Sequence, residues 1–234
     1  MTSVPSASAA DASSERRRSR RPARKPWPAW VHLILALVLV AVLRNFIAQS
    51  FYVPSGSMIP TLQVGDRMIV PKFGQTIEHG DIVVFDGTET FGGNPAPRFD
   101  SAIGKVVSGV GKVFGVDVNE RDYVKRVIGM GGDHVVCCDA NEAITVNGKA
   151  LNERYLAPGM KPSMMPFDVV VPEGHLWLMG DNRSNSADSR AHLGDPGGGM
   201  VPVSDVIGEP VLRYWPLSRF DRITSTTSVP AADG

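Results

Sequence analysis

The chain has 234 residues, 43% of them hydrophobic, which is enough to bury a substantial core in one good-sized domain or two small ones. Its formal net charge is zero, yet residues 1–30 carry seven basic and two acidic side chains, a local balance of +5. The remainder therefore carries −5, and an acidic body with one basic end argues against a nucleic-acid-binding domain.

The basic end precedes an apolar stretch, and together they predict a membrane anchor. Residues 1–28 are rich in Ser, Ala and Arg and are expected to form a disordered cytoplasmic tail. The apolar run Leu33–Leu43 covers only about 17 Å as a helix, short of the ~30 Å hydrocarbon core, so a span must include flanking residues. We predict a transmembrane helix over 29–49 in a lipid bilayer, with the chain from residue 50 onward outside the cytoplasm by the positive-inside rule.

Two other interpretations of this segment stay open. A basic start, an apolar stretch and Ala48-Gln49-Ser50 as a small-x-small site also fit a cleavable signal peptide, whose removal would release a soluble domain. The other interpretation is a buried core helix, and the neighbouring arginines argue against it.

Residues 50–221 are predicted to form one extracytoplasmic, mainly β domain. Short apolar or alternating runs bounded by Gly, Pro, Asp or Asn are typical of strands, and Asn147-Gly148 is a strong hairpin signal. We expect antiparallel sheets that form a barrel-like body, followed by a disordered tail over 222–234. The predicted strands are 67–70, 81–85, 123–128, 134–138, 144–146, 167–171 and 176–179.

Residues 88–122 are predicted to be an insertion or accessory segment of this domain. Apolar residues recur there at helical spacing from Ile103 to Phe114. The segment is expected to form a helix that packs on the body or, alternatively, lies in the membrane interface.

The only two cysteines, Cys137 and Cys138, are adjacent. A disulfide is permitted outside the cytoplasm, but a bridge between neighbours closes a very small ring, so we predict buried free thiols. No set of His and Cys residues surrounds them, and no metal site is expected.

The segment Pro54–Leu62 holds the first candidate for chemistry, Ser57. Two prolines restrict the backbone on either side, and Gly56 permits a tight approach. Such a turn could expose a serine hydroxyl while backbone N–H groups point into the same space, as an oxyanion hole requires. An ordinary turn between strands explains the same residues, so the segment alone is a weak signal.

A nucleophilic serine needs a base, and Lys125 is the candidate. Strand alternation places Lys125 on one face and Arg126 on the other. Between apolar and aromatic neighbours a lysine loses solvation, its pKa falls, and it becomes a usable base. The alternative is that Lys125 faces water while Arg126 is buried in a salt bridge. None of the five histidines lies in a motif that indicates catalysis.

A third polar segment, Gly180–Arg190, follows an apolar strand. Its two aspartates and two arginines could form paired carboxylate–guanidinium bridges that make a loop rigid. An Asx-rich surface loop is the alternative.

Taken together, these segments resemble the signature boxes of bacterial type I signal peptidases. Pro54–Leu62 is similar to the nucleophile box, residues 65–70 to the second box, Tyr123–Asp133 to the lysine box and Gly180–Arg190 to the terminal box. The boxes occur in the family's order, over roughly residues 30–218. One departure is Gly131, where the lysine box usually has proline.

The resemblance implies a role for each of these residues. Ser57 would be the nucleophile and Lys125 the base; the Ser57 N–H and the Ser55 hydroxyl would form the oxyanion hole, and Ser186 would orient Lys125. Asp181, Arg183, Asp188 and Arg190 would be structural. Substrate pockets for small side chains would involve Phe51, Val53, Met58, Leu62, Tyr123 and Val124.

The sequence thus predicts a membrane-bound serine endopeptidase that removes signal peptides from exported preproteins without a metal or organic cofactor. A self-cleaving repressor-type Ser/Lys protease shares the chemistry but carries a DNA-binding domain where this chain has an apolar helix. A non-catalytic, membrane-anchored β module is the alternative from another class. A sortase-like transpeptidase would need a catalytic Cys with His and Arg.

Overall fold

The computed structural model describes residues 28–46, 48–72, 74, 76–92 and 122–224. The chain divides into two compact units, Met1–Leu37 and Val38–Gly234. A single α-helix, α1 (Ala29–Phe46), is present in the described residues, and every described strand belongs to the second unit.

Helix α1 forms within the segment predicted as helical. No helix among the described residues is both long and apolar enough to cross a membrane. Strand β1 (Ala48–Tyr52) begins two residues after the helix ends, so residues 48 and 49 of the predicted span are extended and not helical.

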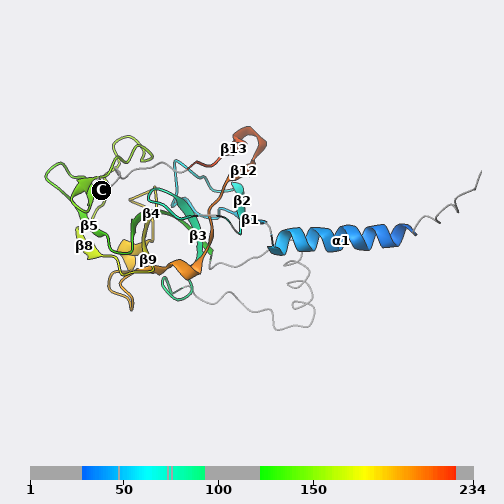
Figure 1. The fold of residues 1–234 in the computed structure, drawn as a ribbon. Helices are drawn as coiled ribbons and strands as arrows, with labels where there is room; N and C mark the ends of the chain where they lie inside the picture. Colours follow the sequence, from blue (N-terminus) through cyan, green and yellow to red (C-terminus); the bar gives the residue numbers. More distant parts are fainter. Residues whose placement is uncertain (1–27, 47, 73, 75, 93–121, 225–234) are drawn as a thin grey trace, which may run out of the picture. The chain divides into compact units, whose positions relative to one another are not determined.

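The strands form three antiparallel sheets (Figure 1). Sheet A has the order β1, β2 (Arg67–Pro71), β12 (Leu212–Trp215) and β13 (Asp221–Arg222). Sheet B has the order β10 (Val201–Pro202), β9 (His175–Met179), β4 (Asp122–Met130), β3 (Ile82–Asp86) and β11 (Val206–Gly208). Sheet C has the order β7 (Lys149–Ala150), β6 (Ile144–Val146), β5 (His134–Cys137) and β8 (Phe167–Val170). Three short 3₁₀ helices, η1 (Ser189–His192), η2 (Val203–Asp205) and η3 (Leu217–Arg219), complete the described elements.

The mainly β, antiparallel prediction is confirmed, but the barrel-like closure is wrong for the described residues. Strand β5 follows β4 directly, yet it pairs with β6 and β8 and not with β4. The chain therefore starts a new sheet at this point, and each sheet keeps two open edges. The seven predicted strands all form, within two residues at each end.

The turn between β4 and β5 explains the departure from the resembled family. A side chain at Gly131 would place its Cβ 2.9 Å from the Cα atom of Glu173 and 3.1 Å from the Gly174 nitrogen. Glycine is therefore required at position 131, because the backbone of the turn at Glu173 and Gly174, just before β9, lies too close for a side chain.

Cys137 and Cys138 form a disulfide, so the predicted free thiols are wrong. Regular pairing of β5 ends at Cys137, which is buried, and Cys138 lies exposed beyond the ladder. The predicted helix, from Ile103 to Phe114, lies wholly outside the described part of the chain, as does the tail from residue 225. Residues 222–224, predicted as disordered tail, are described, and Arg222 pairs in β13.

Strand β4 is the element that positions the site. It is central in sheet B and pairs with β3 on one side and β9 on the other. Six consecutive residues, 124–129, are buried, so both faces of the strand are covered. One face meets a cluster of apolar residues around Met58 and Leu62, and another cluster lies around Trp177 and sheet C. A buried apolar side chain of this size contributes about 1.5–3 kcal/mol, so these clusters fix β4 firmly.

Candidate active site

Ser57 and Lys125 meet in the interior of the second unit. Lys125 Nζ lies 2.8 Å from Ser57 Oγ and 3.1 Å from the Val124 carbonyl oxygen. The two residues expose only 8% and 3% of their surface, respectively. The prediction that Lys125 points inward is confirmed, and the two side chains are at hydrogen-bonding distance, as a nucleophile and its base require.

The environment of Lys125 favours the neutral amine. Burial lowers the pKa of Lys125 from 10.5 to about 8; Asp188 and Asp181 raise it in part, and Arg190 lowers it. No carboxylate in the described part of the chain forms an ion pair with Nζ. An appreciable fraction of neutral lysine is therefore present near pH 7 to 8, which is the form able to accept a proton.

The turn that carries Ser57 is held by the terminal polar segment. The Asn182 N–H donates to the Ser57 carbonyl oxygen over 2.9 Å, and the Asn182 side-chain amide donates to the Gly56 carbonyl oxygen over 3.0 Å. A Cβ at Gly180 would lie 2.5 Å from the Ser57 carbonyl oxygen and would overlap Ser186 Oγ. Glycine is thus required at position 180 for the segment to reach Ser57.

Ser55 and Ser186, predicted to assist the pair, differ in their geometry. Ser55 Oγ lies 3.4 Å from Ser57 Oγ, so its hydroxyl is beside the predicted nucleophile. Ser186 Oγ is buried near Gly180 and beside Asp188, whose pKa it helps to lower, and it forms no hydrogen bond with Lys125. The structure therefore does not form the expected Ser186–Lys125 bond.

The predicted aspartate–arginine pairs form only in part. Arg190 makes two charge-assisted bonds with Asp188, of 2.9 Å and 2.7 Å, as expected. Burial opposes ionisation of Asp188, but Arg190 and the Gly180 N–H outweigh it and hold the pKa of Asp188 below its ordinary value.

Asp181 and Arg183 find their partners outside the terminal segment. Arg126 binds Asp181 through two bonds of 2.8 Å and 2.6 Å, and Arg183 binds Glu153 over 2.5 Å. A buried salt bridge of Arg126 was expected only as the alternative to a buried Lys125, whereas the structure buries both residues. Glu153 was missed altogether, because no local pattern marks a partner 30 residues away in the chain.

Five of the six predicted substrate-pocket residues share one apolar cluster, and Tyr123 lies apart from them. Met58 and Leu62 expose 1% and 0%, so both side chains are fully buried within this cluster. Tyr123 stacks with Phe85 in a different cluster, with its ring 5.9 Å from Lys125 Nζ. The five residues that gather in the cluster are Phe51, Val53, Met58, Leu62 and Val124.

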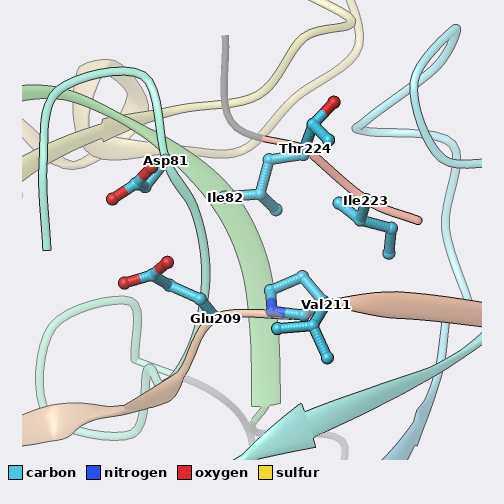
Figure 2. Close-up of a pocket in the computed structure, with 7 residues that line it drawn as sticks. Asp81, Ile82, Glu209, Val211, Ile223 and Thr224 are labelled. Atoms are coloured by element: carbon cyan, nitrogen blue, oxygen red, sulfur yellow. The ribbon is translucent and has the colours of Figure 1, made fainter. Parts of the chain in front are cut away.

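A separate cavity of about 400 Å³ lies away from the Ser57–Lys125 pair (Figure 2). Figure 2 shows the carboxylates of Asp81 and Glu209 on one side and the side chains of Val211 and Ile223 on the other. Burial, followed by the charges of Asp81 and Glu78, raises the pKa of Glu209 to about 7.

Neither histidines nor metal-binding clusters offer a rival chemistry in the described residues. His79, His134 and His192 each contact an aspartate, at 2.6 Å, 2.6 Å and 2.7 Å, and none bonds to Ser57. No group of three His, Cys, Asp or Glu side chains in the described ranges could hold a metal ion.

Comparison with known proteins agrees with this geometry. Residues 27–215 match the model of the family described as signal peptidase, peptidase S26. The chain is 39% identical to the signal peptidase I of Mycobacterium tuberculosis over 217 residues, covering 82% of this chain and 73% of that protein. It is 36% identical over 233 residues to the probable signal peptidase I of Mycobacterium leprae, covering 86% and 80%. It is 32% identical over 217 residues to the signal peptidase I of Bacillus caldolyticus, covering 88% and 97%. The chain therefore belongs to the peptidase S26 family of signal peptidases.

Proposed function

We propose that this protein is a serine endopeptidase that removes N-terminal signal peptides from exported preproteins, with Ser57 as nucleophile and Lys125 as general base. The observation that carries the proposal is the 2.8 Å contact between Ser57 Oγ and a buried lysine amine that has no carboxylate ion pair among the described residues. Membership of the signal peptidase family supplies the substrate class.

The reaction follows from this contact. Neutral Lys125 takes the proton from Ser57 Oγ, and Oγ attacks the carbonyl carbon of the scissile peptide bond to give a tetrahedral intermediate. The Lys125 ammonium then donates its proton to the leaving amine, the C–N bond breaks, and an acyl-enzyme ester remains. Lys125 next takes a proton from water, whose hydroxide attacks the ester, and the proton returns to Ser57 Oγ as the signal peptide leaves.

The oxyanion of each tetrahedral intermediate needs donors beside Ser57. We assign this role to the Ser57 N–H and the Ser55 hydroxyl, since Ser55 Oγ already lies 3.4 Å from Ser57 Oγ. Ser186 orients Lys125 after a shift of its hydroxyl, which is buried beside Gly180. The charged pairs of Asp181, Arg183, Asp188 and Arg190 keep the surrounding segment rigid.

The pocket residues limit which side chains fit before the cut. We expect small side chains at the first and third positions before the scissile bond to be accommodated next to the apolar cluster that contains Met58 and Leu62. The residues proposed to shape these subsites are Phe51, Val53, Met58, Leu62, Tyr123 and Val124.

The placement of the enzyme follows from the basic N-terminal segment and the substrate. We propose membrane association with the N-terminus in the cytoplasm and the domain 50–221 on the other side of the membrane. Protease added outside intact spheroplasts should degrade the domain and leave an N-terminal epitope protected. Protection of the domain until the cells are lysed would contradict this orientation.

The mechanism is tested with a labelled preprotein in detergent. Ser57→Ala and Lys125→Met should each reduce cleavage by a factor of about 10² to 10⁴ or more, because each removes one reacting group. His79→Ala serves as the matched control and should cleave like the wild type. Cleavage by Lys125→Met at the wild-type rate would overturn the proposed mechanism, and loss of turnover in a folded His79→Ala variant would indicate a histidine base.

A further inference from the structure

Tyr155 is a buried residue beside the active site that has no role in the reaction described above. It follows strand β7, exposes 8% of its surface, and packs in the apolar cluster of sheet C. We propose that Tyr155 is a positioning residue for the Ser57–Lys125 pair, because its ring and hydroxyl contact the two guanidinium groups that fix the Ser57 turn. This inference rests on the proposed function.

The ring of Tyr155 contacts Arg126, the neighbour of Lys125 on strand β4. The Arg126 guanidinium carbon lies 4.0 Å from the ring centroid, and Arg126 exposes only 1% of its surface. A cation over an aromatic face is attracted by the negative charge of that face, more strongly where water is excluded. Tyr155 thus restrains the face of Arg126 that its hydrogen bonds to Asp181 and the Gly80 carbonyl leave open.

The hydroxyl of Tyr155 joins the second guanidinium. It donates to Glu153 Oε1 over 2.9 Å and accepts from Arg183 Nη2 over 3.0 Å. Burial raises the pKa of Tyr155 well above its ordinary value, so the phenol stays protonated and the donor is retained. Tyr155 and Glu153 together fix the position of the Arg183 side chain.

The first connection to Ser57 passes through Arg126. Arg126 holds both carboxylate oxygens of Asp181, and Asp181 Oδ2 accepts the hydroxyl hydrogen of Thr61 over 2.5 Å. Thr61 lies four residues after Ser57, in the turn that carries the nucleophile.

The second connection passes through Arg183. Its Nε donates to the Gly180 carbonyl oxygen over 3.1 Å, which holds the backbone that packs against the Ser57 carbonyl. Two residues after Gly180, the Asn182 N–H donates to the Ser57 carbonyl oxygen itself. Both guanidinium groups in contact with Tyr155 are therefore linked to the same turn, Arg126 through Asp181 and Arg183 through the Gly180 carbonyl.

A purely structural role would have a different consequence. If Tyr155 only filled the core of sheet C, its removal would lower stability and leave the turnover of the folded enzyme unchanged. A positioning role changes the alignment of Ser57 Oγ and Lys125 Nζ, so it lowers kcat in the folded enzyme and leaves KM nearly constant.

The experiment compares three variants of the full-length enzyme in detergent, below their unfolding temperatures. Tyr155→Leu removes the ring and the hydroxyl, and Tyr155→Phe keeps the ring. Phe167→Leu is the matched control, because Phe167 is a buried aromatic of the same cluster that contacts the Trp177 ring. We measure kcat and KM on a preprotein from pH 6 to pH 10, with the folded fraction from circular dichroism.

We expect Tyr155→Leu to lower kcat about tenfold or more with KM within about twofold of the wild type. Tyr155→Phe should recover part of the loss and keep kcat about threefold below the wild type, because the hydroxyl that joins Arg183 is missing, and Phe167→Leu should lower the unfolding midpoint without changing kcat. The acidic limb of kcat should move to higher pH in Tyr155→Leu, because a loosened Arg126 leaves more of the Asp181 charge acting on Lys125. The charged groups that act on Lys125 are Asp188, Asp181 and Arg190.

Wild-type kcat and an unshifted pH profile in folded Tyr155→Leu would overturn the inference. If that variant does not fold, Tyr155→Phe decides: kcat about threefold lower at constant KM supports the inference, and a wild-type value and profile overturns it. Failure of the proposed function is recognised separately, because wild-type enzyme would then not cleave, or Ser57→Ala would cleave equally well.

Discussion

The two faces of strand β4 each bury a cation, and the two cations have opposite surroundings. On one face Lys125 is buried beside the Ser57 hydroxyl, without a carboxylate ion pair among the described residues. On the other face Arg126 binds both oxygens of Asp181 and the Gly80 carbonyl. The residues are adjacent in the chain and expose 3% and 1% of their surfaces.

The difference shows what determines the role of a buried cation. Without a paired carboxylate, burial favours the neutral form and lowers the pKa of the lysine, which makes it a base. With a bidentate carboxylate, the guanidinium stays charged and serves as a rigid support. Each site also has the residue type that suits it, because lysine can lose its proton in a protein and arginine cannot.

The largest effect, a loss of kcat, is expected when Lys125 is replaced by arginine. Lys125→Arg keeps a positive charge and hydrogen-bond donors near Ser57 but provides no base at neutral pH. We expect kcat to fall by a factor of about 10³ or more, measured on a preprotein with the folded state verified by circular dichroism. Activity above a tenth of wild type would show that the amine acts only as a donor.

The second prediction concerns the ion pair between Arg126 and Asp181 on the opposite face of β4. Arg126→Met leaves Asp181 buried without its guanidinium, and we expect the free energy of unfolding to fall by about 3–5 kcal/mol. Urea unfolding measures the change. The double variant Arg126→Met/Asp181→Leu removes both charges and should regain part of the loss, whereas equal stability of the single and double variants would contradict the assignment.

The third prediction is the pH dependence of stability that results from the lowered pKa of buried Lys125. The pKa of Lys125 is lowered from 10.5 to about 8 in the folded state, so between these values the unfolded chain binds more protons and stability rises with pH. At pH 7 Lys125→Met should exceed the wild type by up to roughly 3 kcal/mol in unfolding free energy. This advantage should shrink as the pH is raised from 8 toward 10.5, and a constant difference would argue against a depressed pKa.

The smallest effect is expected at Glu209, where an acid is partly buried beside other acids. Its pKa is raised from 4.5 to about 7 by burial and by Asp81 and Glu78, so the stabilisation present below pH 4.5 is lost as the pH rises through 7. Glu209→Gln should be more stable than wild type by about 1 kcal/mol at pH 8, since partial exposure screens the charge, and equal to it at pH 4. Thermal unfolding at the two pH values checks the difference, and an equal shift at both would contradict it.

The sequence predicted those parts of the fold and site that depend on local patterns. The longer strands, from Arg67 onward, alternate or are continuously apolar, and the order of the motifs pointed to Ser57 and Lys125. Strands β1, β7 and β10 to β13 were not predicted, because no apolar alternation bounded by turn residues was recognised in them. The Arg126–Asp181 pair, 55 residues apart, and the failure of β4 and β5 to pair depend on tertiary packing that no local pattern records.

The bond from the Asn182 N–H to the Ser57 carbonyl has a consequence for the synthesis of the enzyme. Ser57, Lys125 and Asn182 lie far apart along the chain, and ribosomes add only about 5–20 residues per second. Ser57, the proposed nucleophile, is therefore synthesised several seconds before Lys125, the proposed base, and Asn182. On the proposed mechanism, a chain therefore becomes active only after the segment 180–183 has been synthesised and has folded against Ser57.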